Sequence, residues 1–177
     1  ARMVRDSALA LHFVVGLVLG SYMACSMLRQ EIRSGTVLAV LSKPVNREVY
    51  FLAKYFGMAL VLILFSGAAT IATVLSAIMV ADPLSFDWRA GGSLLAAPLL
   101  AYLIAGLQNY FLHTHFVSRS FGLLMACLSI SLLIVVFSGP HTLPWSIAHA
   151  GLLLLFAILV LAAIALLLAT RLDVIPT

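Results

Sequence analysis

Long stretches without a charged residue constrain this chain more than any other sequence feature. Four long stretches lack Asp, Glu, Lys and Arg altogether: residues 7–28, 55–81, 90–118 and 120–170. About 20 apolar residues in a helix cross a bilayer, because roughly 30 Å of hydrocarbon is crossed at about 1.5 Å per residue. Each stretch is therefore long enough to span a membrane. The last is long enough for two spans, and Gly139, Pro140 and Pro144 predict a turn that divides it.

The composition supports a membrane protein. Apolar residues make up 64% of the chain and charged residues 9%, whereas soluble domains carry roughly 25% charged residues. This composition excludes a disordered protein, a nucleic-acid-binding module and most soluble enzymes. We expect an all-α, polytopic transmembrane bundle forming a single domain over residues 1–177. The expected spans are approximately 7–28, 55–80, 94–112, 121–137 and 147–169. Because the chain begins with Ala1 rather than Met, we expect it to be a segment of a longer protein.

The basic residues predict the orientation of these five spans. With five spans, the connections 29–54, 112–120 and 171–177 lie on one side of the membrane. They carry seven of the ten Lys and Arg residues, whereas the other side has only Arg2, Arg5 and Arg89. Since cytoplasmic loops are enriched in Lys and Arg, the side with seven basic residues is predicted to be cytoplasmic.

Small residues predict where helices pack against one another. Gly16, Gly20 and Ala24 recur at four-residue spacing in the first span, and 97, 101 and 105 are alanines in the third. Such rows let helix backbones approach closely in lipid. Packing within the chain is favoured over a dimer face, which stays the alternative.

Few side chains in the spans carry reactive chemistry. His12 and His149 are interpreted as neutral histidines that bond to a neighbouring helix, and Gln108 as a second interhelical group. Cys25 and Cys127 are interpreted as packing residues. His113 and His115 flank Thr114 at a helix end, and no nearby carboxylate or cysteine completes a metal site. We therefore expect no catalytic residues and no metal ligands.

The connection between the first two spans is the most informative segment. Residues 29–54 contain seven charges, so this cytoplasmic loop is too polar to span the membrane. Val37, Leu38 and Leu41 share one face of a short predicted helix, and Pro44 is expected to end that helix. Asn46 is placed to cap a new helix beginning near Arg47. The loop fits two roles, an amphipathic segment at lipid headgroups or a docking element for a cytoplasmic partner.

The residues of this loop resemble a known family. The pattern E-I-x-x-G-T begins at Glu31 and L-S-K-P-V-x-R begins at Leu41. Residues 51–57, F-L-A-K-Y-F-G, follow an L-x-x-K-x-x-G pattern with Phe51 in place of the leucine. Together they are similar to the first cytoplasmic loop of ABC-2 type permeases, the membrane subunits of ABC transporters. The resemblance is strongest to the subgroup that includes permeases associated with copper-enzyme maturation. It covers residues 31–57 specifically and the rest of the chain only as apolar helices.

The resemblance implies a coupling helix that docks on a separate ATPase subunit. The implied docking and hinge residues are Glu31, Arg33, Gly35, Thr36, Leu41, Lys43, Pro44 and Arg47. The chain has no G-x-x-x-x-G-K-[ST] phosphate-binding loop, so ATP and Mg²⁺ are expected in the partner and no cofactor in this chain. A second permease copy or a related permease is the other expected protein partner, alongside membrane lipid and without nucleic acid.

The resemblance predicts a permease subunit without catalysis of its own, with export as the expected direction and the substrate unknown. The expected location is the bacterial inner (cytoplasmic) membrane. The alternative is a structural or accessory transmembrane subunit that belongs to a larger assembly and transports nothing.

Overall fold

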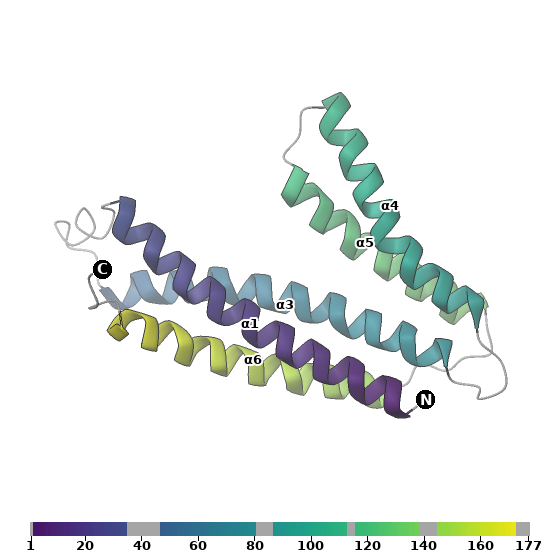
Figure 1. Ribbon diagram of the computed structural model, residues 1–177, viewed down its shortest axis with the longest axis horizontal. Helices are drawn as coiled ribbons and strands as arrows, with labels where there is room; N and C mark the ends of the chain where they lie inside the picture. Colours follow the sequence, from purple (N-terminus) through teal and green to yellow (C-terminus); the bar gives the residue numbers. More distant parts are fainter. Residues whose placement is uncertain (1, 35–46, 81–86, 113–115, 139–144, 173–177) are drawn as a thin grey trace. The chain divides into compact units, whose positions relative to one another are not determined.

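The computed structural model describes residues 2–34, 47–80, 87–112, 116–138 and 145–172. These residues form five α-helices: α1 (Arg2–Ser34), α3 (Arg47–Met79), α4 (Trp88–Leu112), α5 (Phe116–Ser138) and α6 (Trp145–Leu172) (Figure 1). Each contains a segment long and apolar enough to cross a membrane. The predicted all-α fold with five spanning helices is confirmed. The short helix predicted to contain Val37, Leu38 and Leu41 lies outside the described residues.

Helix is the structure expected for these sequences, since a backbone in hydrocarbon has no water to satisfy its N–H and C=O groups. The start of α4 is fixed by Asp87, whose Oδ1 accepts a hydrogen bond from the Arg89 amide at 2.9 Å. This is the geometry of an N-cap, which satisfies one of the otherwise unpaired amides of the first turn. The Asp87 amide donates to the Met79 carbonyl at 3.2 Å, so the end of α3 and the start of α4 are held together.

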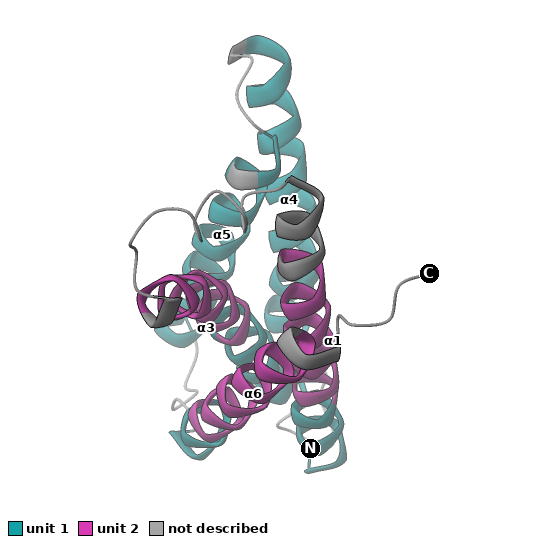
Figure 2. Ribbon diagram, turned by 90° about the vertical axis from the view of Figure 1, so that its left-hand side faces the viewer, with its two compact units in different colours: residues 1–10, 67–151 teal, residues 11–66, 152–177 magenta. Residues whose placement is uncertain are grey.

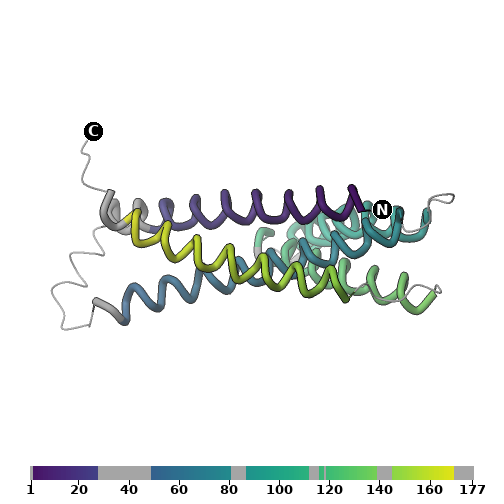
Figure 3. Tube along the Cα trace, turned by 90° about the horizontal axis from the view of Figure 1, so that it is seen from below, coloured from purple at the N-terminus to yellow at the C-terminus, as the bar shows by residue number. Residues whose placement is uncertain are grey.

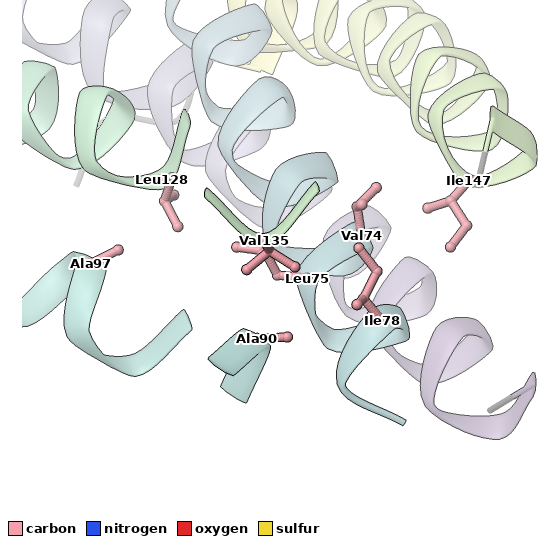
Figure 4. Packing of buried hydrophobic residues seen from close by; sticks show 8 residues of the cluster. All are labelled: Val74, Leu75, Ile78, Ala90, Ala97, Leu128, Val135 and Ile147. Atoms are coloured by element: carbon pink, nitrogen blue, oxygen red, sulfur yellow. The ribbon is translucent and has the colours of Figure 1, made fainter. Parts of the chain in front are cut away.

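The helices fall into two compact units, coloured separately in Figure 2. The first comprises residues 1–10 and 67–151, and in it α4 and α5 pack side by side (Figure 1). Its core contains eight buried apolar side chains, shown in Figure 4: Val74, Leu75, Ile78, Ala90, Ala97, Leu128, Val135 and Ile147. Ala97 of α4 lies opposite Leu128 of α5, which pairs a small residue with a large one.

The second unit comprises residues 11–66 and 152–177. Its parts of α1, α3 and α6 lie side by side in both Figure 1 and Figure 3. The core contains Ala24, Met58, Leu62, Ile158 and Ala162. The Tyr55 hydroxyl donates a hydrogen bond to the Leu159 carbonyl at 3.2 Å, and this bond joins α3 to α6.

The small-residue rows face the interior of their units. In α4, Ala97, Ala101 and Ala105 are at most 2% exposed, whereas the leucines at 95, 99, 103 and 107 are at least 58% exposed. In α1, Gly16, Gly20 and Ala24 are all buried. The prediction that these rows pack within the chain is confirmed. An interior of small residues with leucine outside is typical of a helix whose outer face meets lipid.

Candidate functional site

The predicted docking loop lies between α1 and α3. The uncharged stretch of α1 ends at Leu28, but the helix continues to Ser34. The extension is six residues, or about 9 Å at the usual rise per residue. Glu31 and Arg33 stand on this extension, so the structure places both beyond the apolar part of the helix.

The far end of the loop is the start of α3. This helix begins at Arg47, two residues before its apolar span at Val49, and the helix start predicted near Arg47 is confirmed. Gly35, Thr36, Leu41, Lys43 and Pro44 lie outside the described residues, as does the capping residue Asn46. The docking role of the whole set stays a prediction.

Aromatic and basic side chains follow on the first turns of α3. The Lys54 ammonium lies 5.7 Å from the centre of the Tyr50 ring, within the range of a cation–π contact. Tyr50 also packs edge-on against Phe51, with ring centres 5.8 Å apart. Aromatic rings beside a lysine at the end of an apolar span are typical of the membrane interface.

The polar side chain of His12 is buried in the second unit. It is 3% exposed, and its Nε2 lies 2.9 Å from the Ser66 Oγ, which is also 3% exposed. The bond connects α1 to α3, so the predicted interhelical bond of His12 is confirmed. His12 also meets the Phe65 ring edge-on, at 5.9 Å between centres. The sequence carried no signal that Ser66 would be the partner, because serines recur throughout the spans.

His149 behaves differently. Its Nδ1 donates to the Trp145 carbonyl at 2.7 Å, one turn earlier on the same helix, and the side chain is exposed. The prediction of a bond from His149 to a neighbouring helix is therefore wrong. The physical reason is that a ring on the outer surface of α6 reaches only the backbone of its own helix.

The other candidate residues of the spans make fewer interactions with neighbouring helices. The Gln108 Oε1 is buried without a hydrogen-bond partner among the described residues, so the bond between helices expected there is not made through this atom. Asn109 is exposed. Cys127 packs against the core of the first unit, as predicted, whereas Cys25 is exposed. Both cysteines are free thiols.

Over the described parts of the chain, no three His, Cys, Asp or Glu side chains come together in a way that could hold a metal ion. His113 and His115 lie outside these parts.

Five apolar helices of spanning length, with leucine-rich outer faces, define a polytopic integral membrane protein. Comparison of the chain with protein-family models, with curated proteins and with solved structures gives no match in any of the three. The resemblance to ABC-2 type permeases therefore depends on the sequence of residues 31–57.

Proposed function

We propose that the chain is the membrane permease subunit of an ABC-2 type ABC transporter. The observation that carries the proposal is the charged pattern from Glu31 to Gly57, which lies between two helices of spanning length. The helical extension of α1 beyond Leu28 supports it, because a coupling element has to reach out of the membrane to contact a soluble ATPase.

In this proposal the chain itself catalyses no reaction. A separate ATPase subunit binds ATP and Mg²⁺, and its closure pushes on residues 29–47. A rigid helix transmits such a push along its axis, so α1 and α3 carry the movement into the membrane. A second permease copy, or a related permease, completes the translocation path, and the assembly resides in a bacterial inner membrane with export as its direction.

The residue roles follow from their chemistry. Glu31, Arg33, Lys43 and Arg47 offer charges to a partner surface. Gly35 permits close backbone approach, and Pro44 sets the bend between the short helix and α3. Thr36 and Leu41 are the remaining members of the set, with Leu41 on the apolar face of the short helix.

The test is a purification of the chain from its native membrane in mild detergent, with mass spectrometry of the bound proteins. The variant Glu31→Ala with Gly35→Leu is compared with the wild type and with Asp6→Ala. Asp6 is a matched control, because it lies at the other end of α1 and is an exposed member of an ion pair with Arg5.

Recovery of an ATPase with a phosphate-binding loop, lost in the double variant and kept in Asp6→Ala, supports the proposal. The ATPase activity measured in lipid vesicles should be lower with the double variant than with the wild type or Asp6→Ala. An ATPase recovered equally with all three proteins contradicts the docking role of the loop. Recovery of membrane partners alone, unaffected by either variant, contradicts the permease role and favours the accessory subunit.

A further inference from the structure

His12 is a titratable side chain buried between apolar segments of α1 and α3. Its ring is buried between α1 and α3, with Nε2 bonded to Ser66 and the Phe65 ring at its edge. The other ring nitrogen, Nδ1, is buried and has no hydrogen-bond partner among the described residues. A neutral ring is compatible with this arrangement, since either tautomer can share one proton with the Ser66 hydroxyl.

The described apolar segments of this unit bring no charged residue to the ring. Over the segments that pack here, residues 11–27 of α1, 56–66 of α3 and 152–169 of α6 contain no Asp, Glu, Lys or Arg. Tyr22 and Cys25 are exposed on α1. They lie ten or more residues beyond His12, about 15 Å or more along the helix.

The charged and titratable groups next along these helices lie on their outer parts. Arg5 and Asp6 form an ion pair with each other at 3.3 Å on α1, seven and six residues before His12. On α3, Lys54 and Tyr55 precede Ser66 by more than three turns, and Tyr55 bonds to Leu159. On α6, His149 is exposed and bonded to Trp145. The one carboxylate among these groups, that of Asp6, is paired with Arg5.

A second proton on the ring would change its interactions in two ways. It places a positive charge in apolar surroundings without a counter-ion, which is costly. It also makes both ring nitrogens donors, and Nδ1–H then has no acceptor among the described residues. Both costs fall when water reaches the ring, and separation of α1 from α3 opens a route for water to this buried site.

The contacts of α1 with α3 and α6 are made at short distances by small side chains. A Cβ built on Gly20 would lie 3.3 Å from the Ala162 Cβ and 3.7 Å from the Leu62 Cδ1. In lipid such contacts contribute through van der Waals packing rather than through the hydrophobic effect. The His12–Ser66 hydrogen bond adds a polar attraction between α1 and α3 to this packing.

We propose that His12 is an intramembrane proton-binding site, and that its protonation releases α1 from α3 within the unit of residues 11–66 and 152–177. The helix pair is closed when the ring is neutral and open when it is charged, because the proton binds the open state more strongly. Imidazoles ordinarily gain a proton between pH 5 and 8, so the switch operates on the acid side of neutrality. The proposal does not depend on the permease function.

The test uses the full chain in lipid nanodiscs, with two readouts over a range of about pH 4.5 to 8. Histidine-selective ¹⁵N NMR follows ring protonation, and the His12 signals are assigned by their loss in His12→Gln. Hydrogen exchange of α1, corrected for the intrinsic pH dependence of exchange, follows its release. Gln keeps a side-chain group that bonds to Ser66 but takes up no proton. His149→Gln removes the exposed histidine and is the matched control.

We expect the protection of residues 11–24 to fall at least tenfold as His12 gains its proton, in the wild type and in His149→Gln. His12→Gln should show no such fall. Ser66→Ala weakens the closed state while leaving His12 titratable, so it should move the release to higher pH by about half a unit or more.

Three results would overturn the proposal. The first is a fall in protection that persists in His12→Gln. The second is a charged His12 in a helix that stays protected. The third is a ring that stays neutral, with α1 protected, down to the lowest pH. An ATPase partner is neither present nor measured in this experiment, so its outcome is separate from that of the permease test.

Discussion

Gly16 of α1 faces Ile158 of α6 so closely that a Cβ built on the glycine would lie 2.5 Å from the Ile158 Cδ1. The same position would lie 3.4 Å from the Phe65 ring of α3. Because the side chain of Gly16 is a single hydrogen atom, α1 can lie close to both α3 and α6 at this point. Gly57 of α3, in the same unit, has nothing within 4 Å of the equivalent position.

This contrast predicts the effect of enlarging each glycine. Gly16→Leu should reduce the free energy of unfolding of the unit by about 1–3 kcal/mol, a typical cost of overpacking. Gly57→Leu should be neutral or slightly stabilising, because leucine has a higher helix propensity than glycine. Reversible unfolding in mixed micelles, followed by loss of helical circular dichroism, measures both. Equal losses in the two variants would show that α1 is not packed as described.

The first unit offers a similar test at Gly151 of α6. A Cβ built there would meet the Thr70 side chain of α3. Gly151→Ala should therefore destabilise the unit by about 1 kcal/mol or more, and adding Thr70→Ala should recover part of that loss because it removes the contacting atoms. Gly122→Ala is the control, since its Cβ would meet open space. Additive losses in the double variant, measured in the same unfolding assay, would argue against the contact.

The Tyr55–Leu159 hydrogen bond predicts a smaller effect. Tyr55→Phe removes the hydroxyl and keeps the ring, so the free energy of unfolding should fall by about 0.6 kcal/mol, an average value for polar contacts between membrane helices. Tyr22→Phe changes an exposed tyrosine and should cost nothing measurable. A neutral Tyr55→Phe would mean that water or lipid replaces this bond at no cost.

The distribution of basic residues predicts the orientation of the helices. Exposed Arg89 begins α4 on the predicted outer side, and exposed Arg119 lies near the start of α5 on the predicted cytoplasmic side. With Cys25 and Cys127 replaced by alanine, Arg89→Cys in intact cells should react with a membrane-impermeant maleimide. Arg119→Cys should react only after the membrane is opened. Reaction of Arg119→Cys alone in intact cells would reverse the orientation.

The fold was accessible from the sequence because lipid leaves the backbone few choices. Uncharged stretches of 20 or more residues have to pair their own N–H and C=O groups, and the helix does so locally. Each expected spanning helix therefore appears in the structure, and α3 begins at Arg47 as predicted. The buried sides of α1 and α4 could also be predicted, since rows of Gly and Ala at four-residue spacing favour close helix contact.

The partners of individual side chains were decided by the tertiary structure. His12 and His149 look alike in sequence, but one is buried against Ser66 and the other bonds to its own helix. Gly16 and Gly57 are equally small, but only Gly16 is packed against another helix. The physical reason is that almost every face of these helices is apolar, so hydrophobicity does not distinguish a protein-facing surface from a lipid-facing one. Only the packing of one helix on another makes that distinction.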